Sequence, residues 1–289
     1  MVYDTLVAPF ADFEFMRRAL AAAAALALGA APIGVFLMLR GMSLVGDAMA
    51  HAILPGAAVG FLLSGLNLFA MTVGGLVAGF AVAILAGVVS RVTELKEDSS
   101  LATFYLASLA LGVTIVSVKG TNIDLLHVLF GNILAMDNQT LMVIAINATV
   151  TLVVLAVIYR PLVFECVDPL FLRTVSRAGA PAHLAFLGLV VVNLVNGFHA
   201  MGTLLAVGLM ILPAGIARFW SRDITGMMMI AVVSALLSGY AGLVLSFHSK
   251  VPSGPAIILV ASVFYVLSVL FGRAGGIVRR FFPAPHLEA

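Results

Sequence analysis

The sequence contains repeated apolar runs of roughly 20 residues, separated by short stretches rich in Gly, Pro, Asn and charged residues. A helix of about 20 apolar residues crosses a hydrocarbon core about 30 Å thick, and it satisfies its backbone hydrogen bonds internally. Charged residues make up 10% of the chain, whereas about 25% is usual for a soluble domain. We therefore predict an all-α polytopic membrane protein.

The breaks between apolar runs predict about nine transmembrane helices, with eight or ten as the alternatives. They fall near residues 17–39, 44–64, 68–90, 101–118, 140–159, 183–196, 201–218, 224–246 and 256–272, and the sixth is short. We expect an amphipathic N-terminal lead-in over residues 1–16, a transmembrane domain over 17–275 and a cytoplasmic tail over 276–289. With the N-terminus outside and the C-terminus inside, most Lys and Arg residues fall in inner loops, as the positive-inside bias requires.

Two polar segments are more than simple connectors. Residues 119–139 are expected to form an outer re-entrant or surface segment. Residues 160–181, on the inner side, are too polar to span and too apolar for a free linker, which favours short helices at the membrane face. Either a soluble partner or lipid alone would cover them. The charged side chains of this segment are Glu165, Asp168, Arg173 and Arg177.

An aspartate and a histidine interrupt the second apolar run. Asp47 and His51 are four residues apart, so a helix places both on one face. A carboxylate inside the membrane costs about 3 kcal/mol and usually faces a cavity or a partner. Oxygen and imidazole donors suit Mn²⁺, Fe²⁺ or Zn²⁺. The alternative is a local hydrogen bond near the helix start, with Asp47 or Ser43 as the cap.

Pro55 and Gly56 follow the pair by one turn, and we expect them to kink or break the helix. Two ligands do not complete a metal coordination shell, so other helices, a second copy of the chain or water must supply the rest. His199, in VVNLVNGFHAMGTL, is a weak third candidate. For the polar residues of that stretch, a hydrogen bond between helices or an exposed turn is the favoured interpretation.

Several functions are disfavoured by missing patterns. The three lysines do not follow glycine, so there is no phosphate-binding GxxxxGK[ST] loop and this chain is not expected to hydrolyse ATP through one. The single cysteine excludes an internal disulfide. The basic residues lie in separate loops rather than in one patch, which argues against a nucleic-acid partner. A transport subunit surrounded by membrane lipid is favoured over an enzyme.

The stretch RGMSLVGDAMAHAILPGAAVGFLLSG resembles the signature of the membrane permeases of bacterial zinc and manganese ATP-binding cassette importers. The likeness continues through KEDSSLATFYLASLALGV, LLHVLFGNIL, MGTLLAVGLMILPAGIARFWSRD and VPSGPAIILVASVFYVL, in the same order along the chain. It therefore covers most of the sequence, from Arg40 to Phe271. One departure is Lys250, which stands before PSGP where the family often has an acidic residue.

The resemblance implies a fold similar to cobalamin-type importer permeases, in the bacterial cytoplasmic (inner) membrane. It implies a second permease copy, identical or not, cytoplasmic ATPase subunits docked on residues 160–181, and an extracytoplasmic metal-binding protein that delivers the ion. Asp47 and His51 match the positions that contact the metal. No permanently bound cofactor is implied, because the ion is the transported substrate. The stretch NGFHAMGTLLAVGLMILPAGIARFW looks closer to the manganese or iron branch than to the zinc branch, so Mn²⁺ is favoured and Zn²⁺ or Fe²⁺ remain alternatives.

Two other functional classes remain open at this point. A gradient-driven secondary metal transporter would use Asp47 as its proton carrier. A membrane scaffold would use Asp47 and His51 only as a structural pair.

Overall fold

The computed structural model describes residues 2–65, 67–94, 97–119, 133–167, 172 and 178–278, and these residues contain helices and turns but no strand. The predicted all-α fold is thus confirmed for the described part of the chain. The helices are α1 (Val2–Leu6), α2 (Ala8–Asp12), α3 (Glu14–Leu39), α4 (Val45–Ala52), α5 (Leu54–Ser64), α6 (Leu68–Val92), α7 (Glu97–Lys119), the 3₁₀ turn η1 (Ile133–Ala135), α9 (Asn138–Val167), α11 (Gly179–Met201), α12 (Thr203–Arg218), α13 (Ile224–Ser249) and α14 (Ser253–Phe271).

Within the described residues, eight segments are long and apolar enough to cross a membrane, and α12 is a ninth, shorter apolar helix. Together they correspond to the nine predicted spans, with α4 and α5 forming one of them. The prediction that the sixth span is short is wrong, since α11 has 23 residues and α12 has 16. The polar residues that seemed to end the sixth span lie inside α11.

Asn193 explains how α11 continues through this polar stretch. Its side chain is buried, accepts a hydrogen bond from Asn147 of α9 at 3.1 Å and donates to the Thr151 hydroxyl at 2.8 Å. A second donation, at 2.9 Å, reaches the carbonyl oxygen of Leu189 one turn earlier. Because both polar atoms of the Asn193 side chain have hydrogen-bond partners, this residue can be buried inside an otherwise apolar helix.

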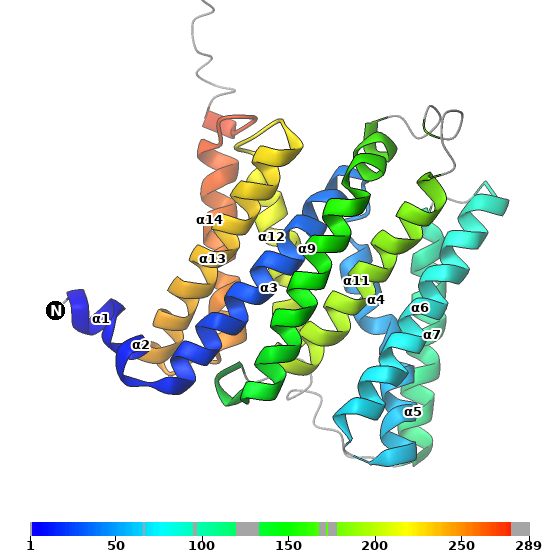
Figure 1. Cartoon of the computed structure of the whole chain (residues 1–289), viewed down its shortest axis with the longest axis horizontal. Helices are drawn as coiled ribbons and strands as arrows, with labels where there is room; N and C mark the ends of the chain where they lie inside the picture. Colours follow the sequence, from blue (N-terminus) through cyan, green and yellow to red (C-terminus); the bar gives the residue numbers. More distant parts are fainter. Residues whose placement is uncertain are drawn as a thin grey trace, which may run out of the picture.

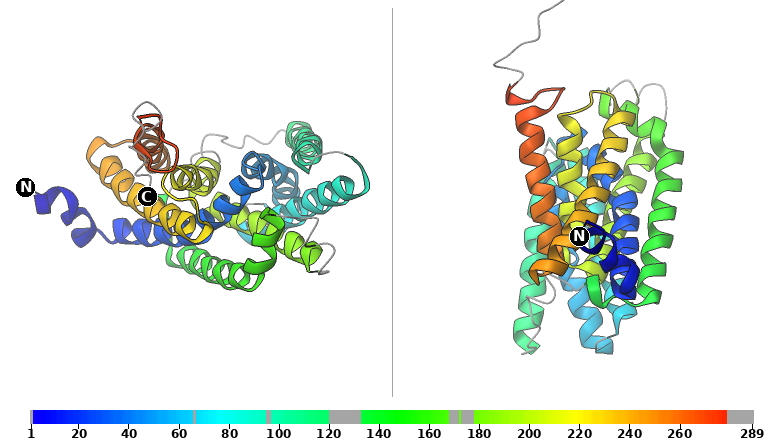
Figure 2. Two further views of the ribbon diagram at one scale, coloured as in Figure 1. Left: turned by 90° about the horizontal axis from the view of Figure 1, so that it is seen from above. Right: turned by 90° about the vertical axis from the view of Figure 1, so that its left-hand side faces the viewer.

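Helix α3 forms the centre of the bundle, packed against α9, α11, α12 and α13 (Figures 1 and 2). Every residue from Gly29 to Leu37 is buried. A Cβ atom at Gly34 would overlap the carbonyl group of Met210 in α12. Glycine therefore lets the two backbones touch, as small residues do between membrane helices.

The remaining helices form two groups on either side of this centre. Helices α5, α6 and α7 pack on one another on one side, and α13 and α14 do so on the other (Figure 1). Helix α11 contacts α3, α9 and α12 as well as α6, so it joins the first group to the centre. The short α1 and α2 lie at the N-terminal edge, where the Tyr240 hydroxyl donates to the carbonyl oxygen of Leu6.

Candidate metal centre

Helix α4, which carries the predicted ligands, ends at a break before α5. Pro55 is the second residue of α5 and has no N–H, so it cannot donate to the carbonyl of His51. The N–H of Ile53 instead points to the carbonyls of His51 and Met49. The hydroxyl of Ser108 in α7 donates to the carbonyl of Ala52 at 2.9 Å. The backbone carbonyl of Ala52 at the break therefore has a hydrogen-bond donor within the protein, as backbone groups in a membrane span require.

The structure brings Asp47 and His51 together on one face of α4. Oδ1 of Asp47 and Nε2 of His51 are 3.8 Å apart, and the side chains are 65% and 38% exposed. Leu44, one turn before Asp47, is 69% exposed on the same side. The pair thus lies on a helix face that the described residues leave partly open.

Helix α7 supports the pair from one side with three residues spaced by three and four positions. The ring of Tyr105 stacks beside His51, with centroids 6.4 Å apart and planes inclined by 28°. Ser108 bonds the end of α4, and at Gly112 a Cβ would come within 3.1 Å of the Pro55 nitrogen. These three positioning residues were not predicted from the sequence, although their spacing in FYLASLALG places them on one helix face.

Helix α12 supports α4 from another side. A Cβ at Gly46 would come within 3.3 Å of Ile211, which is tighter than ordinary packing, and within 3.7 Å of Val207, so glycine lets α4 lie close to α12. Helix α4 also packs against α6 and α11. Because these contacts hold α4 on its other faces, packing sets the direction in which the Asp47–His51 face points.

The two donors suit a divalent ion but do not enclose one. Atoms 3.8 Å apart can both bind an ion that lies about 2.1 Å from each of them. No group of three or more His, Cys, Asp or Glu residues within the described residues could hold a metal. The described part of one chain therefore offers two ligands, and a complete shell requires further donors from outside it.

Other predicted site residues are placed only in part. His199 belongs to α11, but its side chain lies outside the described part. Asp168, Arg173 and Arg177 also lie outside the described residues, as do residues 120–132 of the predicted outer segment. Lys250 ends α13 in the left-handed conformation, with φ 54°, and its side chain is exposed.

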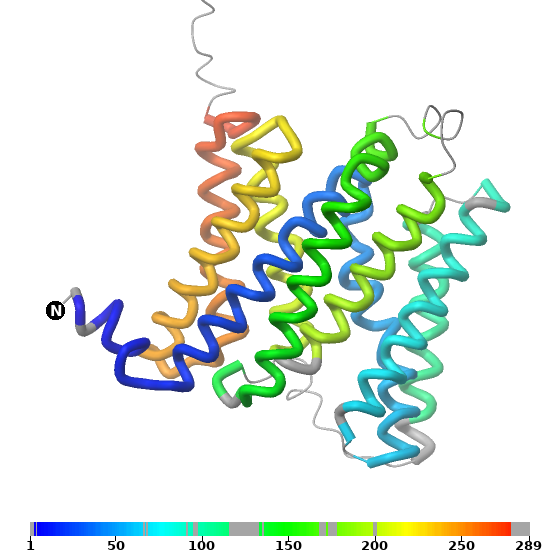
Figure 3. The backbone as a smooth tube through the Cα atoms, in the orientation of Figure 1, coloured from blue at the N-terminus to red at the C-terminus, as the bar shows by residue number. Residues whose placement is uncertain are grey.

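The first part of the expected inner segment 160–181 belongs to α9, which continues without interruption to Val167 (Figure 3). Thirty residues of helix extend about 45 Å, which exceeds a hydrocarbon core of about 30 Å. Pro161 lies inside this helix, so a proline alone did not mark a boundary. Residues 179–181 likewise belong to the first turn of α11.

Glu165 does not present its carboxylate at the surface. Its Oε1 lies 3.4 Å from Nη2 of Arg40 and 3.8 Å from Nδ1 of His183, and the three side chains are 15%, 9% and 3% exposed. Arg40 also reaches Nδ1 of His183 at 2.6 Å and lies over the Phe186 ring. This buried cluster joins the ends of α3 and α9 to the start of α11. His183 was not assigned a role from the sequence.

The helices are long and apolar enough to cross a membrane, and one of them carries an exposed Asp–His pair. A charged residue in a membrane span is costly in free energy and is typical of an integral membrane transport protein. The chain belongs to the ABC 3 transport family, whose family model matches residues 12–272.

Individual relatives agree with this family. The chain is 34% identical over 258 residues to the manganese import system permease protein ScaB of Streptococcus parasanguinis, covering 89% of this chain and 90% of that protein. It is 27% identical over 272 residues to a probable iron transport system membrane protein of Haemophilus influenzae, covering 94% and 98%. Among solved structures, PsaBC from Streptococcus pneumoniae in complex with Fab matches with a TM-score of 0.79 and 27% identity, covering 97% of this chain and 100% of that one.

Proposed function

We propose that this chain is the membrane permease subunit of an ATP-driven importer of divalent transition-metal ions, with Mn²⁺ as its substrate. ATP hydrolysis takes place on separate cytoplasmic subunits. The family supports the transport role, and the name of the Streptococcus parasanguinis relative supports manganese. The Haemophilus influenzae relative keeps Fe²⁺ as an alternative substrate, and the Asp and His donors keep Zn²⁺ as another.

The observation that carries this proposal is the exposed carboxylate of Asp47 on a transmembrane helix. A charge facing lipid near the bilayer centre costs about 2.5–3.5 kcal/mol or more, so such a residue normally faces a protein partner or an aqueous cavity. A second permease copy set against this face of α4 would bring another Asp–His pair towards the first. The ion would then pass between the two copies, bound by side chains from both of them.

Incomplete coordination suits transport rather than storage. With only Asp47 and His51 from each copy, and water at the remaining positions, the ion is held without being trapped. Tyr105 and Ser108 maintain the side chains and the helix break in position as the ion passes. Pro55 keeps the backbone broken, and α7 supplies the partner for the carbonyl at that break.

Coupling to ATP hydrolysis is proposed to run through the end of α9 and the segment up to α11, where Asp168, Arg173 and Arg177 contact the ATPase. Glu165 acts from inside, because its contacts with Arg40 and His183 link this region to α3. The loop after Arg40 leads directly into α4 and its ligands. Movement at the ATPase is thereby transmitted towards the metal pair.

In this proposal the chain lies in the bacterial cytoplasmic membrane. The N-terminus lies outside and the C-terminus inside, so the inner loops hold most of the Arg residues. An extracytoplasmic metal-binding protein delivers the ion from the outer face.

The test is uptake of radioactive Mn²⁺ and Zn²⁺ by cells that carry the whole system at equal membrane abundance. Replacing even an outer partner of a metal ligand lowers affinity or activity by about 10–100-fold. Asp47→Asn and His51→Gln should therefore each reduce uptake by at least about tenfold. Asp12→Asn is the matched control, because Asp12 is an exposed carboxylate on α2, away from the pair.

Uptake at the wild-type rate in both ligand variants would remove the pair from the ion path. Deleting the ATPase separates the proposed importer from a gradient-driven transporter that uses Asp47 as a proton carrier. The importer loses uptake without the ATPase, whereas the secondary transporter loses it only when the gradient is collapsed.

A further inference from the structure

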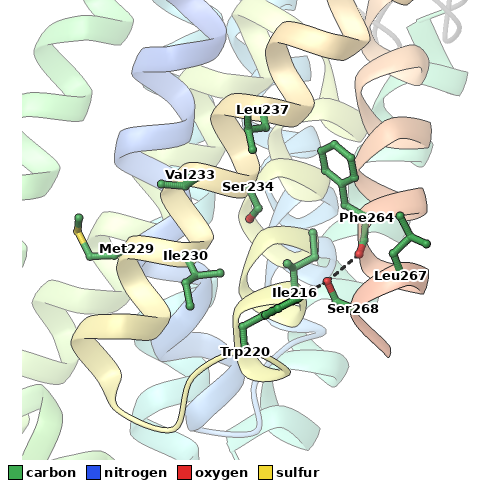
Figure 4. A pocket seen from close by; sticks show the side chains of 10 residues that line it. All are labelled: Ile216, Trp220, Met229, Ile230, Val233, Ser234, Leu237, Phe264, Leu267 and Ser268. Carbon is green, nitrogen blue, oxygen red and sulfur yellow. Dashed lines mark hydrogen bonds between the residues drawn. The ribbon is translucent and has the colours of Figure 1, made fainter. Parts of the chain in front are cut away.

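An apolar groove of about 490 Å³ lies between α13 and α14 at the end of α12 (Figure 4). Its lining comes from Ile216, Trp220, Met229, Ile230, Val233, Ser234, Leu237, Phe264, Leu267 and Ser268. The floor includes the buried residues Ile216, Ser234 and Ser268, while Met229, Val233 and Leu267 are about half exposed or more along its sides. The exposed apolar walls make this a surface groove at membrane depth, open to an apolar occupant.

Trp220 closes one end of the groove and is the only tryptophan in the chain. Its indole Nε1 donates to the Ser268 hydroxyl at 2.8 Å, and Ser268 in turn donates to the Phe264 carbonyl at 2.7 Å. Trp220 follows the last turn of α12, where the apolar span ends. Tryptophan is enriched at this membrane–water boundary, because its ring is apolar and its N–H is polar.

A second cavity, of about 400 Å³, lies at the same end of α12 as Trp220. It is lined by Arg218, Phe219, Arg222, Ala274 and Gly275, so both cavities border the same end of α12 and the region where α14 ends. Both arginines are exposed, and neither forms an ion pair with any residue that the structure describes. The nearby carboxylate of Asp223 already accepts hydrogen bonds from Ser221 and from the N–H of Gly226.

We propose that the groove and the basic cavity together bind one anionic phospholipid. The acyl chain lies in the groove along α13 and α14, and the negatively charged headgroup lies between Arg218 and Arg222. Charge complementarity selects this occupant, because guanidinium groups bind phosphate oxygens with paired hydrogen bonds. Basic pockets between membrane helices are known sites for anionic headgroups. A zwitterionic lipid would bring a cation beside the two arginines and would gain less.

The test uses Trp220 as the reporter. The full chain is reconstituted in dioleoyl phosphatidylcholine vesicles that contain either brominated phosphatidylglycerol or brominated phosphatidylcholine at matched mole fractions, and tryptophan fluorescence is measured. Bromine quenches the indole on contact, so an acyl chain in the groove is detected directly. Brominated phosphatidylglycerol should reach half-maximal quenching at a mole fraction at least about fivefold lower, since one arginine near the membrane surface contributes a factor of that size.

The variant Arg218→Gln/Arg222→Gln should lose this preference and respond equally to both lipids. Its response to brominated phosphatidylcholine should remain that of the wild type, which shows that the groove is intact. Arg160→Gln is the matched control, because Arg160 is an exposed arginine on α9, outside both cavities. It should keep the full preference.

Three outcomes would overturn the proposal. Equal quenching of the wild-type chain by both lipids would mean that the arginines select no headgroup. An undiminished preference in the double variant would place the anionic lipid elsewhere. Absence of quenching by either lipid would mean that another protein surface, such as a second copy, covers the groove. None of these outcomes depends on whether the chain transports a metal.

Discussion

The contact between α5 and α6 can be tested with a single methyl group. In α5, a Cβ at Gly56 would lie 2.5 Å from the carbonyl carbon of Gly74 and 2.7 Å from the Cβ of Ala78, both in α6. Carbon atoms pack best at about 3.5–4.0 Å, so Gly56→Ala would force the helices apart by about 1 Å. Overpacking of this kind typically costs about 1–3 kcal/mol, and occasionally more.

Gly87→Ala is the matched control for this substitution. Gly87 lies inside α6, and a Cβ there would meet no atom within 4 Å. Both substitutions replace glycine by alanine in a helix, where alanine is the more favourable residue by up to about 1 kcal/mol, so helix propensity destabilises neither variant. The difference between the two variants therefore isolates the steric cost.

The measurement is the free energy of unfolding in mixed micelles, followed by circular dichroism during a sodium dodecyl sulfate titration. We expect Gly56→Ala to be less stable than Gly87→Ala by about 1–3 kcal/mol or more. It should also reduce Mn²⁺ uptake, because α5 continues from the helix that carries the ligands. Equal stability of the two variants would refute the close approach of α5 and α6.

Three further predictions concern hydrogen bonds. Ser108→Ala should destabilise the protein by about 1–3 kcal/mol, because the buried carbonyl of Ala52 loses its hydrogen-bond donor. The control is Ser262→Ala, whose hydroxyl donates to a carbonyl of its own helix. The same sodium dodecyl sulfate titration should show a smaller loss of stability for this control. Asn193→Leu should cost a similar amount or more, because it leaves buried partners on α9 unpaired, and an unchanged midpoint would contradict this. The Ser221 hydroxyl, and then the N–H of Gly226, lower the pKa of Asp223 below its ordinary value of 3.8. This cap therefore stabilises α13 above pH 3.8 and loses its effect as the pH falls through the lower folded-state pKa. The stability difference between wild type and Asp223→Ala should shrink between pH 5 and pH 2, and a constant difference would argue against an ionised cap.

Much of the architecture follows from local chemistry and could be predicted. An apolar run of about 20 residues has few stable alternatives to a helix in lipid, so the spans were found without tertiary information. The pairing of Asp47 with His51 follows from helical periodicity alone. Span ends were harder to predict, because they depend on polar residues whose cost is set by their partners. The predicted span 183–196 stopped short of the end of α11 at Met201, and inside this helix the buried amide of Asn193 is bonded by Asn147 and Thr151.

The sequence by itself therefore determined the membrane environment, the helices and the shared face of Asp47 and His51, since these depend on the solvent and on contacts within one turn. Only the tertiary structure decided which helices border that face. Tyr105 and Ser108 reach α4 from α7, and Arg40 reaches His183 across 143 positions of sequence. Contacts of this kind depend on which helix surfaces meet. In lipid that choice depends on the close fit of small residues and on polar pairing, because hydrophobicity is similar on every side.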